Sequence, residues 1–280
     1  MKPIVSVMYR SLIGTTLLAS AMLAGSVQAA SFVNGGFEAG NTSGWTTGGG
    51  SRTSELNNVM TPSQFLPGGS LYAGPSTRSA IITAGTVDPN VGAALGSTVF
   101  SGNFSYRAED TTNGGNASAI SQKVANYTDS NIFFAWKAVL ENGGHTQNES
   151  AEMIITLHDD TTNTNVISRV YNAGTGGGGV DTRFSTQGNL FYTSQWQIEQ
   201  LTIDAALAGH DFTLSLLAAD CEPAGHTGYA YLDGFGAAIP DPSGGGNNGG
   251  GTGTVPEPGS TALLGLGALT LALARRRKKA

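Results

Sequence analysis

Short runs of strand-type residues, separated by Gly- and Asn-rich clusters, recur through the middle of the chain, and no stretch there shows sustained helical periodicity. The strongest run, residues 131–140 (NIFFAWKAVL), is apolar and aromatic and stops at the turn-forming sequence ENGG. Residues 152–158 instead alternate, with Met153, Ile155 and Leu157 on one face. Many short strands with turn-rich spacing predict an all-β fold, a β-sandwich.

Five more ranges complete the predicted set of strands: 97–106, 165–171, 196–203, 212–217 and 229–235. Residues 159–163 fit a hairpin connection. A slip in the alternation near Gln200 predicts a β-bulge. The last two strands are neighbours in the sequence, so we expect them to pair through a loop over residues 218–228.

The N-terminal segment has the layout of a secretory signal. Two basic residues among the first ten precede an apolar stretch over residues 12–24, and residues 27–29 (VQA) suit a signal peptidase. We therefore predict a signal peptide over residues 1–29 and a mature chain that begins at Ala30 or Ser31. The alternative is an N-terminal membrane anchor, which the short apolar stretch disfavours.

Setting the two ends aside uncovers a strongly acidic body. Of the 14 basic residues, two lie in the signal segment and five in the C-terminal tail, whereas one of the 20 acidic residues lies in the tail. The body therefore has seven basic and 19 acidic residues, a net charge of −12. This balance argues against nucleic acid as a partner, because phosphates demand a basic face. It is compatible with divalent cations or neutral glycans.

The body divides into a domain and a linker. Residues 30–240 are long enough for one domain with a hydrophobic core. Cys221 is the one cysteine of the chain, so an intramolecular disulfide cannot form and the exported fold must rest on its core, with a bound metal as the alternative support. Residues 241–254, rich in Gly, Asn and Ser, predict a flexible linker.

The C-terminal tail has three parts. It begins with Val255, Pro256, Glu257 and Pro258, and the prolines keep this segment extended. An apolar run over residues 262–274 follows, and then a basic cluster of Arg275, Arg276, Arg277, Lys278 and Lys279. A helical run of this length spans about 20 Å, short of the roughly 30 Å hydrocarbon core. Snorkelling side chains still let it enter a bilayer, with the basic cluster in the cytoplasm.

This three-part arrangement resembles the PEP-CTERM sorting signal over residues 255–280. The resemblance implies a single short transmembrane helix and cleavage at or beside the motif by an exosortase, an inner-membrane transpeptidase-like enzyme. It also implies an association with exopolysaccharide and biofilm matrix systems. The alternative is a simple tail anchor without processing, which the complete signature disfavours.

Two segments carry the strongest local patterns of the body: residues 32–38 (FVNGGFE), followed by Gly44 and Trp45, and residues 220–234, which end in YAYLDG. They resemble exported jelly-roll domains of the galactose-binding-like or carbohydrate-binding-module type. The resemblance implies that the first segment lies beside the last strand. It further implies a structural Ca²⁺ with Glu38 and Asp233 as ligands, since calcium prefers several oxygen donors. The alternative is a surface Glu38 and an Asp233 that only caps a turn.

The cluster of Asp220, Cys221 and His226 is the most enzyme-like pattern. A cysteine nucleophile needs a base and an orienting group. Here all three lie in one short loop, whereas catalytic groups usually come from separate segments, so a structural role for the Cys and His is the favoured reading. Zinc would need further ligands, and the other candidates are His145, His158 and His210.

Aromatic side chains could form a platform for a sugar ring if their faces are exposed. Trp136 and Trp196 fall in or at predicted strands, and we expect both in the core. Trp45 lies in a Gly- and Thr-rich stretch and is the candidate ligand-binding residue, although burial is the common fate of Trp.

We therefore predict an all-β jelly-roll ectodomain that signal peptidase and exosortase process and that contacts the inner membrane only transiently. Its expected destination is the cell surface or extracellular matrix. The favoured role is non-enzymatic, structural or adhesive, and linked to extracellular polysaccharide. A carbohydrate-binding module and a secreted hydrolase stay open as alternatives, although no paired-carboxylate motif supports the hydrolase.

Overall fold

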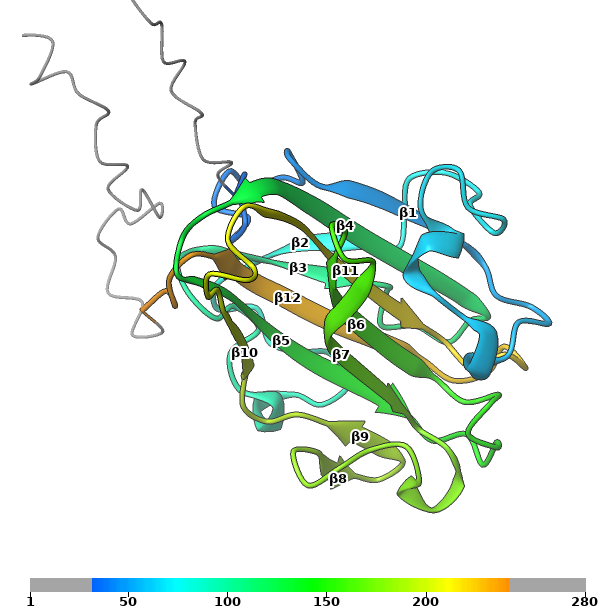
Figure 1. Ribbon diagram of the computed structural model, residues 1–280. Coiled ribbons are helices and arrows are strands. Elements are labelled where there is room, and N and C mark those ends of the chain that lie inside the picture. The colour runs from blue at the N-terminus through cyan, green and yellow to red at the C-terminus, as the bar shows by residue number, and fades with distance from the viewer. Residues whose placement is uncertain (1–31, 242–280) are drawn as a thin grey trace, which may run out of the picture.

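The computed structural model describes residues 32–241. The predicted signal peptide (1–29), the sorting tail with its helix (255–280) and most of the predicted linker lie outside the described residues. Within the described span two antiparallel sheets pack face to face (Figure 1). The all-β sandwich predicted from the sequence is confirmed.

The strands are divided unequally between the two sheets. The five-stranded sheet has the order β1 (Thr46–Ser51), β4 (Asn116–Tyr127), β11 (His210–Ala219), β6 (Glu152–Asp159) and β7 (Thr164–Asn172). The seven-stranded sheet has the order β2 (Ala80–Thr83), β3 (Phe104–Ala108), β12 (Gly228–Gly236), β5 (Asn131–Glu141), β9 (Leu190–Tyr192) and β8 (Ser185–Gln187), and β10 (Gln197–Thr202) also pairs with β5.

Helical structure in residues 32–241 is confined to four 3₁₀ turns: η1 (Asn57–Val59), η2 (Pro62–Phe65), η3 (Ala93–Leu95) and η4 (Thr175–Gly177). None of the helices in this part of the chain has the length and apolar character to cross a membrane.

The apolar run predicted over residues 131–140 forms β5, and both of its faces are buried. Inward residues such as Phe134 and Trp136 belong to the main core between the sheets. On the outer face, Val139 packs in a second cluster with Tyr229 and Leu95. A strand that is covered on both sides needs apolar residues at nearly every position, which explains why this run does not alternate.

The N-terminal segment lies against the last strand, as the resemblance implied. The Phe235 N–H donates to the Gly35 carbonyl at 3.1 Å, and the rings of Phe32 and Phe235 meet edge to face at 4.5 Å. Phe37 is fully buried between Trp45 and Tyr106. The described span therefore begins and ends at one end of the sandwich (Figure 1).

The strand predicted over residues 97–106 is mostly wrong. Pairing begins only at Phe104, and residues 97–103 form bends and irregular backbone. The Asp233 carboxylate accepts hydrogen bonds from the N–H groups of Phe100 and Ser101 at 2.9 and 3.2 Å. Because a side chain satisfies these donors, they need no partner strand.

The bulge predicted near Gln200 is also wrong, since β10 pairs with β5 in unbroken register. The apparent slip arises because Glu199 faces inward and is only 6% exposed. Its carboxylate accepts hydrogen bonds from the Trp136 indole at 3.2 Å and from Arg169 at 2.6 and 2.8 Å. A charged residue at an inward position interrupts the apolar pattern without changing the register.

The expected pairing between the last two strands is wrong as well. β11 pairs with β4 and β6, whereas β12 pairs with β3 and β5 in the opposite sheet. The loop over residues 220–227 therefore crosses between the sheets. The loop over residues 142–151 makes the reverse crossing from β5 to β6, and the two loops meet where the Glu222 N–H donates to the Glu149 carbonyl at 2.8 Å.

Candidate functional site

The outer face of the five-stranded sheet carries an open groove of about 600 Å³. Outward residues of β11, β6 and β7 form its floor, and the segment that contains η1 and η2 forms a wall. This segment covers the apolar half of the face, where Met60 and Phe65 cluster with Ile154 and Leu217. The other half of the face is polar and open to solvent.

A row of hydroxyl groups crosses the polar half of this face. The strand register places Ser121 of β4, Ser215 of β11, Thr156 of β6 and Ser168 of β7 opposite one another. Paired residues in a sheet point to the same face, so the four hydroxyls lie side by side. The Ser215 hydroxyl donates to that of Ser121 at 3.0 Å. The floor thus offers hydrogen-bonding groups at the spacing of neighbouring strands.

The next row along the same strands carries charge and consists of Lys123, Thr213, His158 and Asn165. Asp160 adjoins this row and accepts hydrogen bonds from Lys123 at 3.1 Å and from Thr213 at 2.7 Å. Hydrogen bonds to Asp211 and Asp160 raise the pKa of Lys123, which keeps it positively charged. Within the described part of the chain, Asp160 is the one carboxylate that lines the groove, and it is already paired.

Trp45 does not form the exposed platform expected from the sequence. It is 9% exposed, and its ring stacks on Phe37 at 5.1 Å and leans on Phe235 at 5.7 Å. The indole N–H donates to the Asn34 carbonyl at 3.0 Å. The Gly and Thr residues around Trp45 in the sequence predicted an exposed side chain. In the structure the N-terminal segment folds over the indole. Trp136, as expected, is fully buried in the core.

Glu38 and Asp233 lie close together beside the turn at residues 99–104. Glu38 accepts hydrogen bonds from the N–H groups of Asn103 and Phe104 at 3.0 and 3.1 Å. Burial raises the pKa of Asp233 well above its usual value, and the negative charge of Glu38 adds to the rise. A calcium site needs convergent oxygen atoms, whereas these carboxylates face N–H donors and hold the turn. The structure therefore supplies no added support for Ca²⁺, which stays a prediction.

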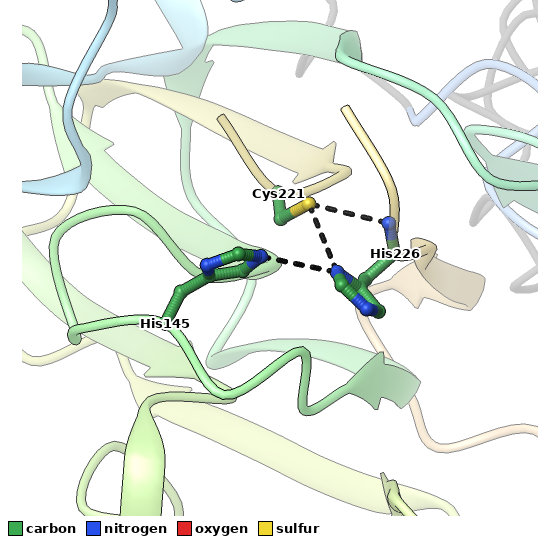
Figure 2. Close-up of side chains that lie close together, drawn as sticks. All are labelled: His145, Cys221 and His226. Atoms are coloured by element: carbon green, nitrogen blue, oxygen red, sulfur yellow. Dashed lines mark hydrogen bonds between the residues drawn. The ribbon is translucent and has the colours of Figure 1, made fainter. Parts of the chain in front are cut away.

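The structure separates Asp220 from the His226 side chain. The Asp220 carboxylate faces Asn116 N–H and Arg78, at 3.3 and 3.4 Å, and does not orient the imidazole. His226 instead contacts Cys221, with 3.4 Å between Nδ1 and Sγ, and His145 from the other crossing loop, with 3.2 Å between ring nitrogens (Figure 2). The three residues considered for catalysis thus do not form a relay.

Of the groove residues, the sequence pointed only to His158, as a candidate zinc ligand, and it did not predict a binding groove. The alternation over residues 152–158 did place Thr156 and His158 on the face opposite the core residues. That pattern could not reveal which strands lie beside β6, and the row of hydroxyls exists only through pairing of β4, β11, β6 and β7. The sequence placed His145 only among the remaining histidines, because it lies 76 positions before Cys221 in the chain.

Comparison with known proteins identifies the tail. A family model described as the PEP-CTERM protein-sorting motif matches residues 254–278. The chain therefore carries a PEP-CTERM sorting motif, which marks an exported protein that passes a membrane. A comparison with curated protein sequences gives no significant match.

Solved structures similar to the chain include carbohydrate-binding modules. TmCBM61 in complex with β-1,4-galactotriose is 10% identical, covers 74% of this chain and 96% of its own, and has a TM-score of 0.38. CBM28, described as specific for non-crystalline cellulose, is 12% identical over 72% and 92% of the chains, with a TM-score of 0.35. The tailspike protein 4 of bacteriophage CBA120 is 12% identical over 73% and 21% of the chains, with a TM-score of 0.34. Similarity at this level carries no inference about a ligand.

Proposed function

We propose that this protein is a non-enzymatic surface or matrix protein that holds neutral polysaccharide in the groove of its five-stranded sheet. The observation that carries the proposal is the row of Ser121, Ser215, Thr156 and Ser168 on the outer face of the sheet, of which Ser215, Thr156 and Ser168 line the groove. Hydroxyl and amide groups bind sugar hydroxyls as both donors and acceptors. The acidic body repels polyanions, which favours a neutral polymer.

The groove is suited to weak, repeated contacts rather than tight binding of one sugar. Within the described part of the chain the groove is lined by no Phe, Tyr or Trp, so ring stacking on a sugar has no platform in it. Hydrogen bonds exchange with water and each contributes only about 1 kcal/mol net. A polymer that engages many copies of the protein gains by multivalency. This pattern fits an adhesive or structural role in an exopolysaccharide or biofilm matrix.

The hydrolase alternative has less support from the geometry. Glycoside hydrolysis generally uses two carboxylates that flank the bond. Among the groove-lining residues of the described span, Asp160 is the one carboxylate. It is paired with Lys123 and accepts a hydrogen bond from Thr213. We therefore propose binding without cleavage, and the assay below includes a measurement of reducing ends.

Thr156 lies in the middle of the hydroxyl row, and its replacement tests the groove. Thr156→Arg should abolish retardation of the full chain, purified in detergent, in gels that contain a neutral glucan or galactan, because the side chain fills the floor. Thr156→Val should weaken binding about 3- to 10-fold, the loss of one hydrogen bond. The wild type should release no reducing ends from either polymer.

The control variant is Thr202→Arg, which adds the same side chain at an exposed position of β10 in the other sheet. It should bind like the wild type. Equal binding by Thr156→Arg and the wild type would reject the groove, and release of reducing ends would reject the non-enzymatic role.

We further propose that signal peptidase and exosortase process the two ends, after transient residence in the inner membrane. Mass spectrometry of the mature protein should show a start at Ala30 or Ser31 and the loss of Arg275 to Lys279. A mature chain that begins at Met1 would contradict the signal peptide. One that retains the basic cluster would favour a permanent tail anchor.

A further inference from the structure

Three potential metal ligands converge at the end of the sandwich where both loops cross between the sheets. His145 comes from the β5–β6 loop, and Cys221 and His226 come from the β11–β12 loop (Figure 2). The ligand atoms of all three lie within 4.8 Å of one another. Cys221 is buried, and both histidines are partly exposed. Two independent segments of the chain thus present one sulfur and two nitrogen donors to a common point.

The spacing of these atoms matches a tetrahedral zinc ion. With Zn–N of about 2.0 Å and Zn–S of about 2.3 Å, tetrahedral ligands are about 3.3 Å apart from N to N and about 3.5 Å apart from N to S. The observed distances are 3.2 Å from His145 Nε2 to His226 Nδ1 and 3.4 Å from Cys221 Sγ to His226 Nδ1. Two edges of the tetrahedron are therefore already in place.

Two backbone N–H groups fix the position of the Cys221 sulfur. The N–H groups of Gly225 and His226 both donate to Sγ at 3.2 Å. These contacts hold Sγ beside the imidazole of His226.

The loops hold these ligands in position without the metal. The Cys221 N–H donates to the His226 carbonyl at 3.0 Å, which closes the short loop. The His145 carbonyl accepts hydrogen bonds from the N–H and hydroxyl of Thr175 at 2.9 and 2.6 Å. Little reorganisation is needed to bind an ion.

We propose that His145, Cys221 and His226 bind one Zn²⁺, with water as the fourth ligand on the exposed side. Sulfur and imidazole donors select such a metal over Ca²⁺ and Mg²⁺, which prefer oxygen. The ion joins the two crossing loops and so ties the two sheets at the end remote from residues 32 and 241. Because the chain has one cysteine and cannot form an intramolecular disulfide, the metal supplies a cross-link that stabilises the fold. None of the three ligands lines the groove, so the zinc proposal does not depend on whether the groove binds polysaccharide.

The test uses the full chain without a histidine tag, purified in detergent and freed of metal. Zn²⁺ should bind at one equivalent and raise Tm by about 5 °C or more at saturation, because it binds the native state alone. Co²⁺ should give the near-ultraviolet charge-transfer band of a cobalt–thiolate bond. Cys221→Ser should remove that band, and His145→Asn should weaken Zn²⁺ binding at least about 100-fold.

His158→Asn is the matched control, because His158 lies in the groove and away from the three ligands. It should bind Zn²⁺ like the wild type. Far-ultraviolet circular dichroism of each metal-free variant checks that it folds, and His226→Asn replaces Cys221→Ser if the latter does not. Failure of the folded wild type to bind Zn²⁺ would overturn the proposal. So would His145→Asn and His226→Asn variants that bind Zn²⁺ as tightly as the wild type.

Discussion

Glu152→Gln is expected to raise the free energy of unfolding by up to about 5 kcal/mol at pH 9 and to leave it almost unchanged at pH 4. Glu152 is 1% exposed at the start of β6, and its Oε2 atom has no hydrogen-bond partner in the described part of the chain. Burial raises the pKa of Glu152 to about 8, and Arg52 opposes this rise only in part. Glutamine keeps the shape of the acid without the cost of ionisation.

The sign follows from proton binding. Below pH 4.5 both the folded and the unfolded chain carry the proton on Glu152. Between about 4.5 and 8 only the folded chain retains it, so this group makes the wild type lose stability as pH rises through that window. Above about 8 the penalty is complete. Burial likewise raises the pKa of Asp220 to about 7, so part of the wild-type slope should survive in the variant.

Urea unfolding of metal-free wild type and variant at pH 4, 7 and 9 measures this difference. The variant should have the shallower pH dependence, and its advantage should grow with pH. An advantage that is the same at all three pH values would show that ionisation of Glu152 is not the cause. A variant that is less stable at pH 9 would show that the pair with Arg52 outweighs burial.

Gly35→Ala is expected to lower the free energy of unfolding by about 3 kcal/mol or more. A Cβ atom at residue 35 would overlap the Phe235 carbonyl oxygen, which is backbone and has no room to move aside. The hydrogen bond from the Phe235 N–H to the Gly35 carbonyl would then break. Loss of this contact separates the N-terminal segment from β12 and exposes Phe37 and Trp45.

Gly236→Ala is the matched control because it lies at the end of the same strand. The nearest atom to its added Cβ is the Ala238 carbonyl oxygen at 3.8 Å, an ordinary contact. It should cost less than about 1 kcal/mol. Thermal and urea unfolding measure the stability of both variants. If Gly35→Ala is as stable as Gly236→Ala, the N-terminal segment adds little to the stability of the fold.

Local patterns were sufficient for the strands that are longest or most regular. The apolar run over residues 131–140 and the alternation over 152–158 became β5 and β6, because burial on two faces or one face leaves a direct signature. Prediction failed where side chains took the role of strand partners or of core residues. Asp233 satisfies the turn at residues 99–101, and Glu199 occupies an inward position through pairs with distant arginines.

The sequence by itself determined that the domain is all-β, that the body is acidic, and that the tail carries a PEP-CTERM motif. Composition, alternation and a contiguous motif are local properties that need no knowledge of neighbours in space. Only the tertiary structure decided that β11 and β12 lie in opposite sheets, that Trp45 is buried, and that His145 meets Cys221 and His226. The row of hydroxyls on the outer face of the five-stranded sheet is likewise decided only by the tertiary structure. Each depends on pairing between segments far apart in the chain, and alternation specifies the face of a strand but not its partner.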